Sequence, residues 1–167
     1  MRLSILSALA AAAFLAACSS DVPVNDAGGT GTGTQSATTD GSMTGTAVPG
    51  SADDFNQNVG NTVYFDLNSY TLSSEAQSQL QRQSAWLQQY PATTLTVEGH
   101  ADERGTREFN LALGERRANA VANYLVALGV NQSRLSVISY GKERPLCVQS
   151  DESCWSQNRR GVSAVNQ

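Results

Sequence analysis

The sequence changes composition near residue 60, and this change decides where a hydrophobic core can form. Residues 19–60 contain eight glycines among many Thr, Ser, Asn and Asp residues, and Phe55 is their only aromatic residue. Such a segment cannot bury enough apolar surface to offset the entropy that a chain loses when it is ordered. We therefore predict a flexible linker over 18–60 and one folded domain over 61–167, a length that suits a single core.

The first 18 residues have the pattern of a secretory signal peptide, which we assign to 1–17. Arg2 is followed by an apolar run of about 13–15 residues, shorter than the roughly 18 that a membrane span requires. The run ends in Leu15-Ala16-Ala17-Cys18, which resembles the bacterial lipobox and implies cleavage before Cys18 and its acylation. The alternative is an ordinary signal peptide with an incidental cysteine. Ser19 and Ser20 resemble the pattern that sends lipoproteins to the outer membrane, so we expect a lipid anchor there, with the domain facing the periplasm.

Charge and composition exclude several classes of function. Residues 61–167 hold ten acidic and ten basic residues, so the domain has no basic excess for binding nucleic acid. One His and three Cys exclude a zinc-finger array. His100, Asp102 and Glu103 lie close in sequence, but one nitrogen ligand makes a poor metal site. We expect no metal and no cofactor, and we interpret His100 as a hydrogen-bonding residue.

Strand and helix patterns alternate over 61–167. Leu95 and Val97 alternate with polar residues, whereas Leu72, Leu80 and Leu87 lie on one helical face. The predicted elements are strands at 62–65, 94–98, 135–140 and 161–165, a helix from a cap at Thr71 or Ser73 to Pro91, and helices at 108–128 and 155–160. This order, β-α-β-α-β-(α)-β, predicts an α/β fold, a two-layer α+β sandwich with helices on one face of a mixed sheet. Strands separated by helices favour parallel pairing with right-handed crossovers.

Arg117 lies where the long helix is expected to be apolar. With Leu113 set at 0° and about 100° per residue, Arg117 falls at about 40°. The apolar members of this expected buried stripe are Phe109, Leu113, Ala120, Val121, Tyr124 and Leu128. An arginine there is unfavourable unless its guanidinium reaches a partner or a cleft. Two interpretations stay open: a structural role, in which Arg117 snorkels or pairs with an acid, and a ligand-binding role.

The loop 99–106 joins the second strand to this helix and carries Asp102. Ligands of α/β folds usually bind at the carboxyl ends of strands, and helix N-termini favour anionic groups. Asp102 and Arg117 facing one cleft would form a receptor for a zwitterion, with an ammonium at Asp102 and a carboxylate at Arg117. The alternative is that Asp102 simply pairs with Arg104 or Arg117.

Residues 61–166 resemble the OmpA-like C-terminal domain family, and closely the Pal group of peptidoglycan-associated lipoproteins within it. The matching segments are 63–66, 97–106, 109–110, 113–121, 139–143 and 158–160. The resemblance implies non-covalent binding to the diaminopimelate of the peptidoglycan stem peptide through Asp102 and Arg117. It also implies that Phe65, Asp66, Asn110 and Leu113 line this site. A further implied partner is the periplasmic propeller protein of the Tol system, in envelope integrity and cell division.

Cys147 and Cys154 depart from the pattern of the family. Because Cys18 is assigned to lipid and the periplasm is oxidising, we predict a disulfide between them, the alternative being two free thiols.

The predicted function is therefore a lipid-anchored binding module that makes and breaks no bond. An enzyme acting on peptidoglycan would need an acid or nucleophile with a base in reach, and no such set is visible in the sequence. A bare structural spacer is the third hypothesis.

Overall fold

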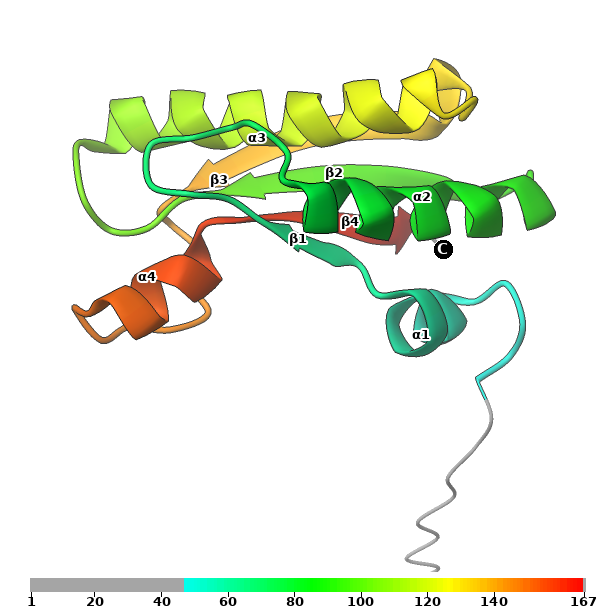
Figure 1. Cartoon of the computed structure of the whole chain (residues 1–167), viewed down its shortest axis with the longest axis horizontal. Coiled ribbons are helices and arrows are strands. Elements are labelled where there is room, and N and C mark those ends of the chain that lie inside the picture. The colour runs from blue at the N-terminus through cyan, green and yellow to red at the C-terminus, as the bar shows by residue number, and fades with distance from the viewer. Residues whose placement is uncertain (1–46, 167) are drawn as a thin grey trace, which may run out of the picture. The chain divides into compact units, whose positions relative to one another are not determined.

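The computed structural model describes residues 47–166, which form one β-sheet with helices packed against it (Figure 1). The predicted signal peptide, Cys18 and the linker as far as residue 46 lie outside the described residues. No helix within 47–166 is long and apolar enough to cross a membrane. The elements in chain order are α1 (Ala52–Asp54), the π-helix η1 (Phe55–Val59), β1 (Thr62–Tyr64), α2 (Ser74–Gln89), β2 (Thr94–His100), α3 (Arg107–Ala127), the 3-10 helix η2 (Gln132–Arg134), β3 (Leu135–Gly141), α4 (Glu152–Asn158) and β4 (Arg160–Asn166).

The sheet is mixed, with strand order β1-β4-β2-β3. Only β2 and β3 are parallel, and they are connected through α3, whereas β4 is antiparallel to both of its neighbours. The predicted α/β class with a mixed sheet is confirmed. The expected preference for parallel pairing holds for one pair alone, because the C-terminal strand enters between β1 and β2 in the opposite direction.

The core lies between the sheet and the two long helices α2 and α3. Its fully buried side chains come from both layers and include Leu80, Leu87, Leu95, Val97 and Leu125. Ser73, one of the two predicted caps, begins α2 by accepting a hydrogen bond from the Ala76 amide (3.2 Å). Thr106 caps α3 in the same way, which fixes where the loop that carries Asp102 ends.

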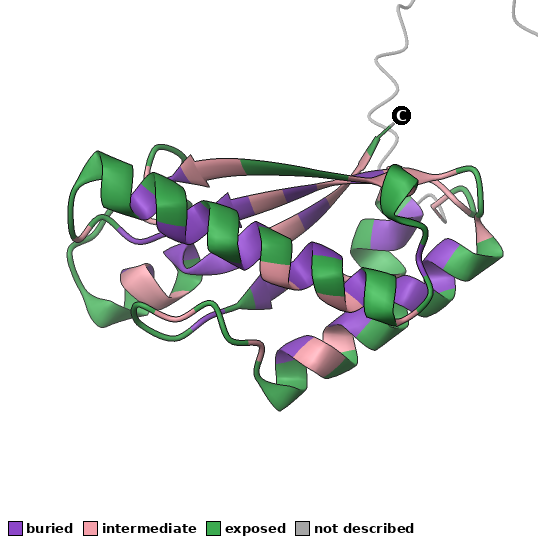
Figure 2. Ribbon diagram, turned by 90° about the horizontal axis from the view of Figure 1, so that it is seen from above, coloured by how far each residue is buried: buried purple, intermediate pink, exposed green. Residues whose placement is uncertain are grey.

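The buried side of α3 differs from the predicted stripe. Phe109 is 47% exposed, and Figure 2 shows buried and exposed residues alternating along the helix. The buried residues are Asn110, Leu113, Gly114, Arg117, Ala118, Val121, Ala122 and Leu125. Gly99 of β2 and Gly114 approach so closely that a Cβ on Gly99 would lie 1.8 Å from the Gly114 carbonyl oxygen. This contact brings the small-residue side of the helix onto the sheet and turns Phe109 outward, so the prediction of a buried Phe109 is wrong.

The folded unit begins before residue 61. Phe55 is completely buried in the core, and the Asp54 carboxylate accepts hydrogen bonds from Trp86 Nε1 (2.9 Å) and the Gly50 amide (2.8 Å). The predicted end of the linker at residue 60 is therefore about ten residues too late. Gln79 and Gln83 of α2 also donate to the carbonyls of Val59 and Gly60, so burial of one ring and several polar contacts anchor a segment whose composition is otherwise polar.

The last helix also begins earlier than predicted. Asp151 caps α4 by accepting from the Cys154 amide (3.0 Å), so that α4 spans Glu152–Asn158 and not 155–160. Arg159 leaves the helical conformation and Arg160 begins β4. This boundary points the Arg159 side chain at the candidate site.

Candidate functional site

Arg117 is completely buried on the sheet side of α3. Its guanidinium donates three hydrogen bonds to backbone carbonyls: Nε to Ser69 (2.8 Å), Nη1 to His100 (2.8 Å) and Nη2 to Asp66 (3.0 Å). Two of these carbonyls belong to the loop between β1 and α2, and the third ends β2. Arg117 therefore joins two segments that are distant in the sequence, a role that neither snorkelling nor pairing with an acid describes.

The charge of Arg117 is not neutralised by a direct partner. Burial lowers its pKa to about 10, a change that nearby Asp102 opposes and Arg159 reinforces. The guanidinium therefore stays charged at neutral pH. None of the ion pairs found within residues 47–166 includes Arg117. Three of its five N–H groups are used, which leaves one on each terminal nitrogen for another acceptor.

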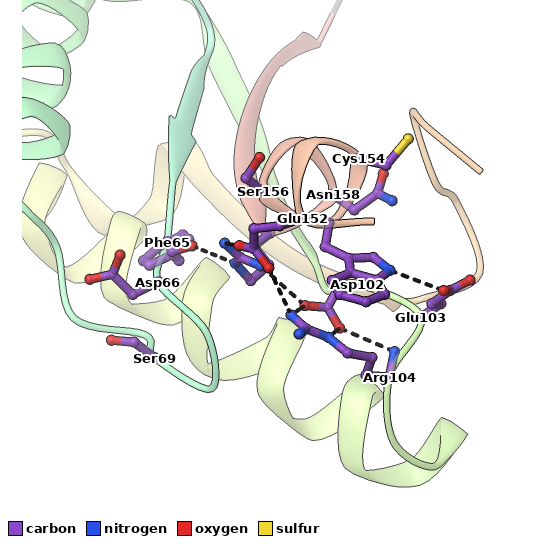
Figure 3. Close-up of polar contacts among 12 residues, drawn as sticks. Phe65, Asp66, Ser69, Asp102, Glu103, Arg104, Glu152, Cys154, Ser156 and Asn158 are labelled. Carbon is purple, nitrogen blue, oxygen red and sulfur yellow. Dashed lines mark hydrogen bonds and ion pairs between the residues drawn. The ribbon is translucent and has the colours of Figure 1, made fainter. Parts of the chain in front are cut away.

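Asp102 follows β2 and is 5% exposed. Its carboxylate accepts from the Arg104 amide (3.1 Å), from Arg104 Nε (3.2 Å) and Nη2 (2.6 Å), and from Arg159 Nη1 (3.4 Å) (Figure 3). Burial raises the pKa of Asp102, but the hydrogen bonds and charge of Arg104, helped by Arg159, outweigh it and hold the pKa below its usual value. Of the pairings that the sequence left open, Asp102 makes the one with Arg104 and not the one with Arg117.

Residues of α4 and its end complete the surroundings of Asp102, and they are not among the site residues predicted from the sequence. Arg159 is buried and reaches three acceptors: Asp102, Glu152 (2.5 Å) and the Phe65 carbonyl (3.0 Å). The Trp155 ring lies 4.0 Å from the Arg104 guanidinium carbon, and its Nε1 donates to Glu103 (3.0 Å). The match at 158–160 was a signal for Arg159. Nothing in the pattern pointed to Trp155, whose contacts depend on where α4 packs.

The other four predicted site residues lie around these charges. The Phe65 ring is 5.2 Å from the Arg117 guanidinium carbon, and Asp66 contributes the carbonyl that Arg117 holds. Asn110 is buried and donates from Nδ2 to the Arg104 carbonyl (2.8 Å), which fixes the loop that carries Asp102. Leu113 is buried one turn before Arg117 on the same side of α3. The structure thus gathers Phe65, Asp66, Asp102, Asn110, Leu113 and Arg117 around two loops and one helix.

The structure joins Cys147 and Cys154 in a disulfide, the pairing that the sequence predicts, with a Cα–Cα distance of 5.0 Å. Asn158, at the C-terminal end of α4, binds the start of the loop that this disulfide closes. Its side chain accepts from the Leu146 amide (2.8 Å) and the Cys147 amide (3.2 Å), and it donates to the Cys147 carbonyl (2.7 Å). The disulfide and Asn158 together fix α4, and α4 carries Trp155 and is followed by Arg159.

His100 does not act as the predicted hydrogen-bonding residue. Its ring is buried, and neither ring nitrogen has a hydrogen-bond partner within the described part of the chain. Glu98 Oε2 lies 3.6 Å from Nε2, too far for a hydrogen bond. Burial, with the charges of Arg160 and Arg144, lowers the His100 pKa to about 4. Residues 47–166 contain no cluster of three His, Cys, Asp or Glu residues that could hold a metal ion.

Residues 64–159 of this chain match the protein-family model described as "OmpA family". A peptidoglycan-associated lipoprotein of Mesorhizobium japonicum is 48% identical over 99% of this chain and 93% of its own length. The protein of the same name from Agrobacterium fabrum is 56% identical over 72% of this chain and 68% of its own.

The fold also has solved counterparts. The crystal structure of the peptidoglycan-associated lipoprotein from Burkholderia pseudomallei is similar, with a TM-score of 0.62 and 40% sequence identity. The similarity covers 64% of this chain and 90% of that structure.

Proposed function

The chain belongs to the OmpA family and, within it, to the peptidoglycan-associated lipoproteins, and from this premise we propose that it grips the diaminopimelate of the stem peptide. The family binds peptidoglycan and is not a family of enzymes, in agreement with the expectation for this chain. The binding is non-covalent, and Asp102 and Arg117 hold the two charges of the zwitterionic end.

The observation that carries this proposal is the separation of two buried opposite charges. Arg117 and Asp102 lie close enough for Asp102 to raise the pKa of Arg117, yet they form no ion pair with each other. A ligand with an ammonium and a carboxylate satisfies both. The ammonium donates to Asp102, and the carboxylate accepts from the N–H groups of Arg117 that the backbone leaves unused.

Arg104 controls access to Asp102 in this scheme. Its side chain is 33% exposed and covers the carboxylate with two side-chain hydrogen bonds. An incoming ammonium must share Asp102 with Arg104 or displace it toward solvent. Arg159 is buried and stays, so Asp102 keeps one cationic partner whether or not ligand is bound.

Four further residues shape the pocket in this proposal. Phe65 and Asp66 form the turn whose carbonyls Arg159 and Arg117 hold in place. Asn110 fixes the backbone of Arg104. Leu113 supplies an apolar wall for the methylene chain of diaminopimelate.

In the cell, acylated Cys18 anchors the chain in the outer membrane and residues 18–46 link that anchor to the domain. Many copies in one layer make weak individual sites effective together. The result is a periplasmic tether between the outer membrane and the cell wall.

A second partner, the propeller protein of the Tol system, belongs to the same proposal. Leu67 and Tyr70 on the loop after β1, and Phe109 at the start of α3, are each about half exposed. Exposed apolar residues of this kind, close to charged groups, are typical of protein interfaces. Since these loops also form the peptide site, we expect the propeller protein and the wall to compete.

Co-sedimentation with isolated cell-wall sacculi tests the peptide site. The chain from residue 18 onward, with Cys18→Ser for solubility, is compared with its Asp102→Ala and Arg117→Lys variants, and circular dichroism checks that they fold. Arg116→Ala, on the exposed side of α3, is the matched control. We expect the parent and the control to pellet with diaminopimelate sacculi and not with sacculi that carry lysine instead. Equal pelleting of all folded variants would refute the site.

The same incubation addresses the enzyme hypothesis. The proposal requires that no soluble muropeptide is released from the sacculi over the course of the experiment. New soluble fragments, formed by the parent and not by a heat-denatured sample, would contradict a pure binding function.

A further inference from the structure

A cleft of about 460 Å³ opens beside the proposed peptide site, at the edge of the sheet formed by β1. Its walls come from the end of β1, the loop that precedes α2, and the end of α4. Arg159 connects the two places, because it lines the cleft and lies 3.4 Å from the Asp102 carboxylate. The volume lies within the roughly 300–1,000 Å³ that is usual for small-ligand pockets.

The side chains of this cleft are rich in polar groups, most of them neutral. Tyr64, Thr71 and Ser156 contribute hydroxyls, Gln157 an amide and Asp66 a carboxylate. Within the described residues, the Asp66 carboxylate and the hydroxyls of Tyr64 and Thr71 show no hydrogen bond to another protein group. They are therefore available to a ligand, and acceptors are well represented among them.

The charge of the cleft selects against anions. Among the described residues that line it, Arg159 is the one basic residue, and that guanidinium is already bonded to Asp102, Glu152 and the Phe65 carbonyl. Asp66 and Glu75 give the cleft a negative balance. A phosphate or a peptide carboxylate would meet no free cation among the described residues of the cleft. The hydroxyl groups of a neutral molecule would instead meet hydrogen-bond acceptors there.

Tyr64 adds an apolar surface to these polar groups. Its side chain is 54% exposed although it lies within a strand. An exposed ring flanked by acceptors matches the two surfaces of a pyranose, whose C–H face packs on an aromatic ring and whose hydroxyls donate at the rim.

From these observations we infer that the cleft is a saccharide subsite that takes a neutral sugar ring of the glycan strand. This inference rests on the proposed function, since the stem peptide held at Asp102 is covalently attached to that strand. Tyr64 supplies the stacking surface. Ser156 Oγ and Gln157 Nε2 already donate to the Ser153 carbonyl, so Ser156 Oγ and Gln157 Oε1 act as acceptors for sugar hydroxyls, and the Thr71 hydroxyl can donate or accept.

Two ligands that differ only in the sugar test the inference by calorimetry. One is the diaminopimelate tripeptide alone, and the other is the same tripeptide on its N-acetylglucosamine–N-acetylmuramic acid disaccharide. The protein is the chain from residue 18 with Cys18→Ser. One stacked ring and one or two hydrogen bonds predict that the disaccharide form binds about tenfold more tightly. Tyr64→Ala and Gln157→Ala should each remove most of this gain and leave tripeptide affinity unchanged. Gln81→Ala, on the exposed side of α2 and outside the cleft, is the matched control and should change neither affinity.

The outcomes separate the two proposals. Equal affinity for both ligands, or equal weakening of both by Tyr64→Ala, overturns the saccharide subsite and leaves the peptide site standing. If the tripeptide fails to bind, the proposed function fails. Binding of N,N′-diacetylchitobiose alone then tests whether the cleft is a saccharide subsite. Chemical-shift changes at Tyr64 and Gln157 on titration with this disaccharide support the subsite, and their absence overturns it.

Discussion

Arg117 and Arg159 approach the candidate site from two sides, and their partners differ in charge. Arg117 is bonded only to neutral backbone carbonyls, at Asp66, Ser69 and His100. Arg159 reaches two carboxylates, those of Asp102 and Glu152. The first arrangement fixes the path of the backbone and leaves the positive charge without a direct acidic partner within the described residues. The second fixes the position of a negative charge.

The two sides also differ in how they are secured. The Arg117 side depends on the packing of α3 against the sheet, through the close contact of Gly99 and Gly114. The Arg159 side depends on a short helix held by a disulfide and by Asn158. Loss of the first should therefore unfold the domain, and loss of the second should loosen one edge of the site.

The largest effect is expected from Arg117→Ala. It removes the side-chain donor of the Ser69 and His100 carbonyls and one of the two donors of the Asp66 carbonyl, and it empties a fully buried position. We expect the free energy of unfolding to fall by about 3–5 kcal/mol in urea denaturation. Arg117→Lys should lower the free energy of unfolding less than Arg117→Ala does, and Arg116→Ala should change it little. A loss below about 1 kcal/mol for Arg117→Ala would show that water replaces the guanidinium and that the comparison is wrong.

Acid should distinguish the two sides by their pH windows. Below pH 6.5 the unfolded chain protonates His100, whereas the folded chain does not until about pH 4. Stability should therefore fall by about 3 kcal/mol between pH 6.5 and 4, and His100→Asn should flatten this part of the curve. Asp102, whose pKa is lowered, contributes stability that is lost only as the pH falls below its ordinary value of 3.8. A wild-type stability that stays level from pH 6.5 to 4 would contradict the buried neutral His100.

Removal of the disulfide should act on the Arg159 side. Opening the loop between Cys147 and Cys154 in the double Ala variant is expected to cost roughly 2.5 kcal/mol, by the chain-entropy estimate for about eight residues. Hydrogen exchange should become faster in α4 and remain slow in α3. Equal acceleration in both helices would mean that the two sides form one cooperative unit.

The smallest effect is expected from Trp155→Ala. This change removes the ring stacked on Arg104 and the hydrogen bond to Glu103. The loop that carries Asp102 should become more mobile, and affinity for the diaminopimelate tripeptide should fall about two- to fivefold, as measured by calorimetry. Trp155→Phe keeps the ring and should lose less. If Trp155→Ala binds as well as the parent, α4 does not position Asp102.

Much of the fold could be predicted because it depends on local patterns. Alternation of apolar and polar residues located β2, and helical spacing with Pro91 located α2. The order of elements indicated a two-layer fold with helices on a mixed sheet. The prediction failed for Phe109, since the predicted stripe left out Gly114, Ala118 and Ala122, which are buried. Gly114, Ala118 and Ala122 determine which side of α3 can approach the sheet, and their effect depends on Gly99 in a distant strand.

The site divides in the same way. The sequence marked Asp102 and Arg117 as unusual, because a charge within a buried stripe and an acid at a strand end are visible in one dimension. It could not assign partners, since the carbonyls that hold Arg117 come from residues as far away as Asp66. Arg159 and Trp155 reach Asp102 and Arg104 across more than fifty residues of sequence.

The sequence alone therefore determined most of the helices and strands over 61–167, their order, and two charged residues of the site, Asp102 and Arg117. It did so because helical and strand periodicity, capping and turn chemistry act between residues that are close along the chain. The tertiary structure decided which face of α3 is buried, where the folded unit begins and which groups each arginine holds. These outcomes depend on the packing of segments that are distant in sequence, and no local pattern records them.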